Sequence, residues 1–235
     1  MRVKELWRYP VKSLLGERLD SARVTPAGIE GDRRFAIYDV ETGFGLTARR
    51  VPELLFASAR LREDGSAEIT LPGGGVARSD DELSDWLGRA VTLRSSDSTV
   101  TRLFENPRDF EHDSDWAPFE AAEGPFHDSA STRVSLVSTA TIGAWDRRRF
   151  RSNVLLDGEG EDELVGSRVQ LGETQLDIGK QIPRCVMTTR PQADGIERDL
   201  DVLRTIARER GSNLAVGALV SLPGTIRVGD ELAQL

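Results

Sequence analysis

The sequence predicts an α+β protein that is predominantly β, with a β-barrel, a smaller β-rich part and a few short helices. Runs of β-branched, aromatic or alternating apolar residues recur along the whole chain, and turn-forming residues separate them, as in PGGG at 72–75. Few stretches carry the three- or four-residue apolar spacing of a helix. Strand-like and helix-like stretches do not alternate, which argues against a doubly wound parallel sheet.

The strand-like runs follow one another from the N-terminus onward. The run RVKELW ends before Pro10, and RRFAIYDV ends at the turn signal ETG. A hairpin is predicted to turn at Glu173 and Thr174. The predicted strands occupy residues 2–7, 33–40, 54–61, 67–71, 91–94, 133–138, 150–156, 168–172, 175–179, 185–189, 213–222 and 225–232.

Three stretches predict short helices, at residues 80–89, 139–145 and 199–211. In the first, Asp80 is expected to cap the N-terminus, and Gly88 stands where helices end. In the last, the apolar residues share one face and Gly211 fits the position that follows a helix. Residues 105–128 are rich in Pro, Asp, Glu and aromatic residues without periodicity, so we expect an irregular connection that flanks a site.

The composition limits the kinds of function. Asp and Glu outnumber Lys and Arg by 39 to 31, so the chain lacks the cation excess that binds nucleic acids or anionic membranes. No apolar stretch has the length of a signal-peptide core or of a membrane span. One cysteine cannot form an internal disulfide, and with only His112 and His127 beside it a protein-ligated zinc or iron–sulfur site is not expected. We expect a cytoplasmic protein without nucleic-acid or membrane partners.

Cys185 is the only cysteine, in the sequence IPRCVMTT. A lone cysteine is most often a small buried apolar residue. Here Arg184 precedes it and Pro183 interrupts any strand before it, so the thiol can also lie exposed beside a cation, where a thiolate is favoured. A thiolate is a soft ligand that suits a transition metal. Both interpretations stay open on these residues alone.

Arginines concentrate in the segment RRRFRSN at 147–153. If this segment enters a strand with Phe150 inward, Arg149 and Arg151 point together to the opposite face. Guanidinium groups suit phosphate and other oxyanions, so an anion site is one interpretation, and a solvated charged surface is the other. Cations or polar groups in loops offer further candidates, each weak alone: Lys12, Ser13, Arg33 and Asp128.

The common catalytic signatures are absent. The sequence contains no G-x-x-x-x-G-K-[ST], no G-x-S-x-G and no H-E-x-x-H. Cys185 with His112 or His127 could suggest a thiol hydrolase, but no other residue pattern supports that function.

Seven segments taken together resemble the MOSC superfamily, in the two-part branch that includes the mitochondrial amidoxime-reducing component and its bacterial relatives. They occur in the family's order and run from one end of the chain to the other: YPVKS, GDRRFAIYD, LTARR, FRSNVLL, DELVG, PRCVMTT and PGTIRVGDEL. The resemblance implies an N-terminal β-rich domain at 1–104 and a MOSC β-barrel domain at 105–235, with the site at their interface. Two positions depart from the family: Ser152 replaces a usual Pro, and Pro183 replaces a small polar residue.

The resemblance also implies a site. Cys185 matches the cysteine that ligates molybdenum in a molybdopterin cofactor. Arg151 and Asn153 match the Arg and Asn of the family's F-R-P-N block, and Lys12, Ser13 and Arg33 match positions that hold the pterin and its phosphate. With the candidates from loop chemistry, the expected cofactor-binding residues are Lys12, Ser13, Arg33, Asp128, Arg149, Arg151, Asn153 and Arg184.

Three functions are compatible with this resemblance. The first is a molybdenum-dependent reductase of small N-hydroxylated substrates, independent of pyridoxal phosphate. Its electrons would come from a separate protein of the ferredoxin, flavodoxin or cytochrome b5 kind, because the chain lacks the cysteines for an iron–sulfur domain of its own. The second is sulfur transfer through a persulfide on Cys185. The third is a carrier that binds the molybdenum cofactor without turnover.

Overall fold

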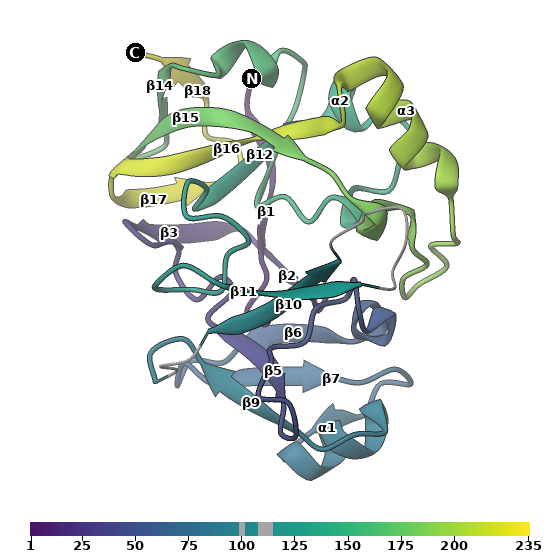
Figure 1. Ribbon diagram of the computed structural model, residues 1–235. Coiled ribbons are helices and arrows are strands. Elements are labelled where there is room, and N and C mark those ends of the chain that lie inside the picture. The colour runs from purple at the N-terminus through teal and green to yellow at the C-terminus, as the bar shows by residue number, and fades with distance from the viewer. Residues whose placement is uncertain (99–101, 108–114) are drawn as a thin grey trace.

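The computed structural model describes residues 1–98, 102–107 and 115–235, and strands predominate in it (Figure 1). The largest sheet has eight strands, all antiparallel to their neighbours except the parallel pair β12–β13. The predicted fold class is confirmed. In spatial order the sheet contains β18 (Leu232–Gln234), β14 (Arg168–Leu171), β15 (Thr174–Pro183), β16 (Asn213–Leu222), β12 (Val134–Ser138), β13 (Val154–Leu156), β1 (Val3–Arg8) and β2 (Glu17–Leu19).

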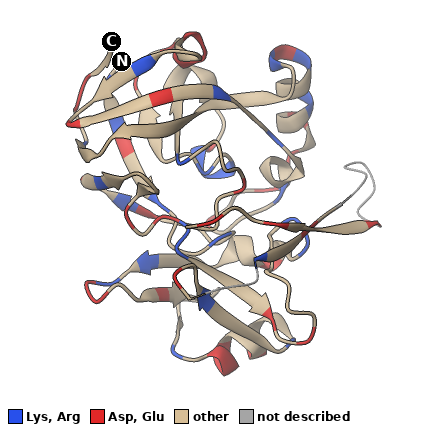
Figure 2. Ribbon diagram, turned by 60° about the vertical axis from the view of Figure 1, so that its left-hand side comes forward, with Lys and Arg blue, Asp and Glu red and all other residues tan. Residues whose placement is uncertain are grey.

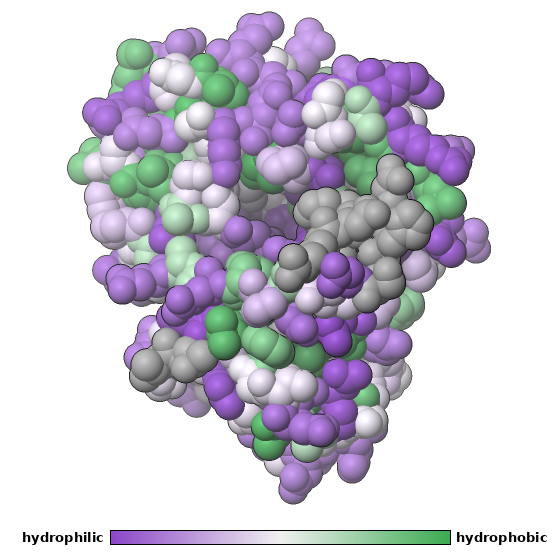
Figure 3. All heavy atoms as spheres, in the orientation of Figure 1, coloured by the Kyte–Doolittle hydropathy of each residue, from purple (hydrophilic) through white to green (hydrophobic). Residues whose placement is uncertain are grey.

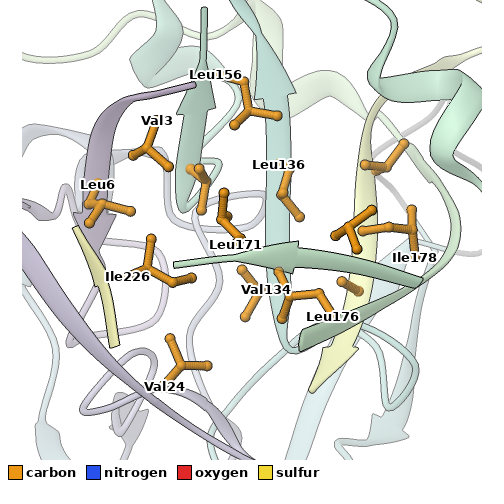
Figure 4. Close-up of a cluster of buried hydrophobic side chains, with 14 of the residues drawn as sticks. Val3, Leu6, Val24, Val134, Leu136, Leu156, Leu171, Leu176, Ile178 and Ile226 are labelled. Atoms are coloured by element: carbon orange, nitrogen blue, oxygen red, sulfur yellow. The ribbon is translucent and has the colours of Figure 1, made fainter. Parts of the chain in front are cut away.

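A three-stranded sheet packs against this large one. It joins β17 (Gly224–Arg227) to β3 (Ser21–Thr25) and β4 (Gly28–Ile29). Apolar side chains from both sheets form one buried cluster, in which Ile226 and Val24 lie near Leu171 and Val134 (Figure 4). The strands β1 to β4 therefore belong structurally with the C-terminal strands. The predicted boundary between residues 104 and 105 stays a prediction, and the packing crosses it.

The other half of the molecule has its own core, built from short hairpins and the helix α1 (Asp80–Leu87). Its buried residues include Leu14, Ile37, Leu54 and Leu83. Its strands are β5 (Phe35–Asp39), β6 (Ser58–Leu61), β7 (Ala67–Thr70), β8 (Val76–Ala77), β9 (Val91–Ser95), β10 (Leu103–Pro107) and β11 (Trp116–Glu120), and a 3₁₀ turn η1 (Pro52–Phe56) precedes β6.

The two halves meet along the connection between β1 and β2. Bridges join Val11 to Phe35 and Leu15 to Ser58 in the smaller half. Gly16 allows the chain to fold back so that β2 pairs with β1. A Cβ at this position would lie 2.2 Å from the Arg8 carbonyl oxygen and 2.6 Å from the Tyr9 ring. The segment 9–16 is therefore fixed to both halves.

The helices agree with the prediction, with one change of cap. α2 (Thr139–Ile142) and α3 (Leu200–Arg210) form where expected, and Gly211 ends α3 with a left-handed φ of 57°. α1 begins after Ser79, whose hydroxyl accepts from the Glu82 N–H. Asp80 is not the cap, because its carboxylate instead accepts from the Leu93 N–H and the Thr92 hydroxyl.

Five other predictions are wrong in part. The predicted strand 54–61 begins with the 3₁₀ turn η1, and the predicted strand 225–232 is divided between β17 and the start of β18. Residues 105–128 are not wholly irregular, since β10 and β11 form a hairpin there; residues 108–114, including His112, lie outside the described residues. The predicted strand 150–156 contains only β13. The predicted strand 185–189 is a 3₁₀ turn, η4 (Val186–Thr189), because the Thr188 and Thr189 hydroxyls donate to carbonyls three residues earlier.

Candidate functional site

Tyr9 is the structural centre of the site. Its ring is buried, its N–H donates to Asp32 Oδ1 at 2.7 Å and its hydroxyl donates to the Ser152 carbonyl at 3.2 Å. The guanidinium carbons of Arg33 and Arg151 lie 4.9 and 4.8 Å from the ring centroid. One aromatic ring therefore holds two cations from distant parts of the chain beside each other.

The backbone is strained at three residues of this site. Ser13, Arg33 and Arg151 have φ angles of 71°, 52° and 53°, a left-handed conformation that costs a residue with a side chain about 1 kcal/mol or more. Hydrogen bonds hold these residues together: Arg151 Nη1 donates to the Ser13 carbonyl at 3.3 Å, and Arg33 Nη2 donates to the Arg151 carbonyl at 3.2 Å. The Ser13 hydroxyl faces the backbone, where it accepts from the Ala48 N–H.

Lys12 and Asp128 form an ion pair at the edge of this group. The Lys12 ammonium is buried, donates to the Phe126 carbonyl at 3.1 Å and lies 5.1 Å from the Phe104 ring centroid. The Asp128 side chain is 89% exposed. The charge of Lys12, with smaller effects from Arg33 and Arg151, holds the pKa of Asp128 well below its usual range. The carboxylate is thus ionised and accessible.

Arg184 brings the segment of Cys185 to the same place. Its Nε donates to the Leu214 carbonyl at 2.7 Å and its Nη1 to the Phe150 carbonyl at 2.9 Å. Its Nη2 is buried and has no hydrogen-bond partner among the described residues. Burial lowers the pKa of Arg184 to about 10, and Cys185 and Tyr9 act in the opposite direction.

Cys185 follows Arg184 at the start of η4. Its side chain is partly exposed, and its carbonyl accepts from the N–H and the hydroxyl of Thr188. Among the described residues, no group of three or more His, Cys, Asp and Glu side chains is placed to hold a metal ion. A metal at this sulfur would need further ligands from a cofactor.

Asn153 and Arg149 act on the site through other groups. Asn153 Oδ1 accepts from the Ser135 N–H, while its Nδ2 donates to Asp32 Oδ2 at 3.1 Å. Arg149 belongs to a 3₁₀ turn, η2 (Arg147–Arg149), and donates to the carbonyls of Thr188, Arg190 and Glu197. The condition for Arg149 and Arg151 to share a face of a strand is not met, because Arg147–Arg149 form a 3₁₀ turn and β13 begins only at Val154. Their roles as cofactor ligands stay predictions.

Two buried residues of the site were not singled out from the sequence, and a third, His127, was considered only as a metal ligand or a partner of Cys185. Tyr9 and Asp32 occur in YPVKS and GDRRF, but nothing local shows that they meet. Asp32 is fully buried and accepts from Tyr9, Arg33 and Asn153. His127 is also buried, with Nε2 3.3 Å from the Ala27 carbonyl oxygen. Burial, aided by Arg33, lowers the pKa of His127 to about 4, so it is neutral at pH 7.

The assembled cluster is basic. Lys12, Arg33, Arg151 and Arg184 carry four positive charges, against the two carboxylates of Asp32 and Asp128, which leaves two positive charges. Lys and Arg gather on loops at the middle of the molecule in Figure 2. Figure 3 shows a recess between the two halves with hydrophilic residues in its floor. Such a cluster is suited to a dianionic phosphate.

No described helix has the length and apolar character needed to cross a bilayer. Comparison with solved structures gives a TM-score of 0.42 and 14% identity with the YUAD protein from Bacillus subtilis, over 98% of this chain and 93% of that chain.

Among known sequences, the mitochondrial amidoxime reducing component 2 of Bos taurus is 22% identical over 99% of this chain and 83% of its own length. The amidoxime-reducing component 1 of Mus musculus is 24% identical over 99% of this chain and 82% of its own. The molybdenum cofactor sulfurase of Anopheles gambiae is 26% identical over 95% of this chain. The chain spans about a third of the length of the sulfurases that it matches.

Family models match both parts of the chain. Residues 1–101 match the MOSC N-terminal beta barrel domain, and residues 123–233 match the MOSC domain. The two matches occur in this order and leave only a short stretch between them. The chain therefore belongs to the MOSC family, in the two-part arrangement of an N-terminal β-barrel domain followed by a MOSC domain.

Proposed function

We propose that this protein is a molybdenum-dependent reductase of small N-hydroxylated compounds, which receives electrons from a separate redox protein. The observation that carries the proposal is the basic cluster beside the only thiol. Its excess of two positive charges matches the charge of a phosphate dianion, and in the described part of the chain no group accepts from the buried Nη2 of Arg184. A buried guanidinium N–H without a partner costs free energy unless a bound group accepts from it.

The residues present fit a pterin cofactor that carries a phosphate. Lys12, Arg33, Arg151 and Arg184 would hold its anionic parts, and the Cys185 thiolate would ligate the molybdenum. When bound, the cofactor supplies two-electron redox chemistry with transfer of an oxygen atom, and the protein controls its orientation and access.

The remaining residues position these ligands. Asp32 neutralises Arg33 and fixes the backbone of Tyr9. Asn153 holds Asp32, and Arg149 binds three carbonyls of the segment that follows Cys185. The two departures from the family, Ser152 and Pro183, fall next to this cluster. The Ser152 carbonyl still accepts from Tyr9, so the missing proline does not remove that contact.

The amidoxime reducing components support the reductase, since they align with 99% of this chain at 22–24% identity. The separate electron donor and the N-hydroxylated substrate class belong to this proposal.

The test is to produce the chain in a host that makes the molybdenum cofactor and to measure bound molybdenum by elemental analysis. We expect about one molybdenum per chain, loss of at least about tenfold in Cys185→Ala, and retention in the neighbouring control Val186→Ala. The loaded protein should reduce a panel of amidoximes and hydroxylamines with a chemical electron donor. Well-folded protein without molybdenum, or unchanged molybdenum in Cys185→Ala, would contradict the proposal.

Sulfur transfer is the second candidate, because the sulfurase relatives also align with almost the whole chain. Mass spectrometry of the intact protein distinguishes it: a labile adduct of roughly 32 Da on Cys185 without bound molybdenum would identify a persulfide. Bound cofactor without reduction of any substrate would instead identify a carrier.

A further inference from the structure

A second group of cations, Arg102 and Arg133, contacts the loop 121–125, which precedes Phe126 and Asp128 in the chain. Arg102 is only 7% exposed, and its Nη2 donates to the Gly124 carbonyl. Arg133 Nη2 donates to the Glu123 carbonyl at 3.4 Å. The two guanidinium groups therefore bind the carbonyls of consecutive residues in one loop.

No carboxylate among the described residues pairs with either arginine. The other contacts of Arg102 are the Ser96 carbonyl at 3.3 Å and the Phe126 ring, whose centroid lies 4.7 Å from its guanidinium carbon. Arg102 Nε and Arg133 Nη1 are both buried, and neither has an acceptor among the described residues. Burial, with the charge of Arg102, lowers the pKa of Arg133. In the described part of the chain, each cation thus lacks a carboxylate partner and keeps one buried N–H group unpaired, which costs free energy.

We propose that Arg102 and Arg133 form a second anion site, which takes a small tetrahedral oxyanion such as inorganic phosphate. A dianion would balance both charges, and its oxygens would accept from N–H groups that have no acceptor. The loop gives access, because Glu123 and Gly124 are exposed and a Cβ at Gly124 would meet no atom within 4 Å.

The second site is connected to the first through one short segment. The Phe126 carbonyl accepts from Lys12, and Asp128 pairs with the same ammonium. The segment 123–128 therefore binds Arg102 and Arg133 at its beginning and Lys12 at its end. An oxyanion that fixes the loop 121–125 would also restrict Asp128.

Inorganic phosphate is the probe, titrated by isothermal calorimetry. The experiment uses an Arg151→Gln background, because the basic cluster also attracts phosphate. We expect Arg133→Gln in this background to weaken phosphate binding by at least about tenfold. The control Arg94→Gln removes another arginine of this region, over the Tyr38 ring at 4.6 Å, and should leave the affinity unchanged. Equal affinity with and without Arg133 would overturn the proposal.

A second measurement needs no substitution in the loop. In the Arg151→Gln background, phosphate at saturating concentration should slow amide hydrogen exchange in 121–126, and sodium chloride at the same ionic strength should not. Unchanged exchange in that segment would overturn the proposal even if Arg133→Gln failed to fold. Neither result depends on molybdenum, so the second site and the proposed reductase can fail separately.

Discussion

At the scale of single residues, the candidate site depends on buried polar groups that hydrogen-bond to the backbone and to one another. Tyr9 and Asp32 illustrate why the sequence did not reveal them. Lys12, Arg33 and Arg184 are expected in the site because they match positions of the MOSC family; as isolated cations near turns they are weak signals. A buried tyrosine or aspartate is recognised only from its partners, and Ser152 and Asn153 lie more than 120 positions along the chain from Asp32 or Tyr9.

His127 leads to a prediction about pH. Burial, aided by Arg33, lowers its pKa from 6.5 to about 4. In the unfolded chain the imidazole of His127 therefore binds a proton below about pH 6.5, whereas in the folded chain it binds one only below about pH 4. The contribution of the neutral His127 to the free energy of unfolding is fully present above about pH 6.5. It falls as the pH drops from 6.5 to 4, by at most about 3 kcal/mol.

The substitution His127→Gln removes this titration while keeping a donor for the Ala27 carbonyl. We expect the stability of the variant, from urea denaturation at pH 7, 6 and 5, to fall less steeply than that of the unsubstituted chain. Other titrating groups cancel in the difference between the two proteins. Parallel pH curves would show that His127 is not the group responsible.

At the scale of elements, the predicted helices and strands form where the apolar periodicity is strong. The predictions fail where side chains hydrogen-bond to nearby backbone groups. α3 and the β14–β15 hairpin form where their patterns place them. The segment after Cys185 has a β-branched sequence, but two threonine hydroxyls turn it into η4. A pattern of apolar residues does not report such local bonds.

The β1–β2 connection allows a test of how this element holds Tyr9. In Gly16→Ala the added Cβ would meet the Arg8 carbonyl and the Tyr9 ring, so β2 or the ring must move. We expect a loss of about 1–3 kcal/mol of folding stability and a lower molybdenum content. The matched control is Gly179→Ala in β15, where the added Cβ meets no atom within 4 Å. Equal effects of the two substitutions would contradict this account.

At the scale of the whole molecule, the chain crosses between the two halves more than once. β1 pairs with β13, and β17 pairs with β3, so the large core needs residues from both ends of the chain. The sequence predicted the strands and the family order of the domains. It did not predict that N-terminal strands pair with C-terminal ones, because pairing between distant strands depends on three-dimensional packing that no local pattern encodes.

Removal of residues 1–104 tests whether the large core needs the N-terminal strands. Residues 105–235 expressed alone would leave β13 without β1, and would expose the apolar cluster that Val3, Leu6 and Val24 cover. We expect no cooperative unfolding transition in circular dichroism, and recovery of the transition when residues 1–104 are restored. A cooperative transition in the fragment would show that the MOSC part folds independently of the N-terminal strands.

The left-handed backbone at Ser13, Arg33 and Arg151 has a consequence for protein engineering. A design method that ranks positions by backbone preference would replace all three residues with glycine, which adopts such φ angles without strain. Each replacement would relieve about 1 kcal/mol or more, and two of the three would delete a charge of the basic cluster. Selection for thermal stability alone would therefore act against the residues that converge on Tyr9, and a stabilised version of this protein should keep them.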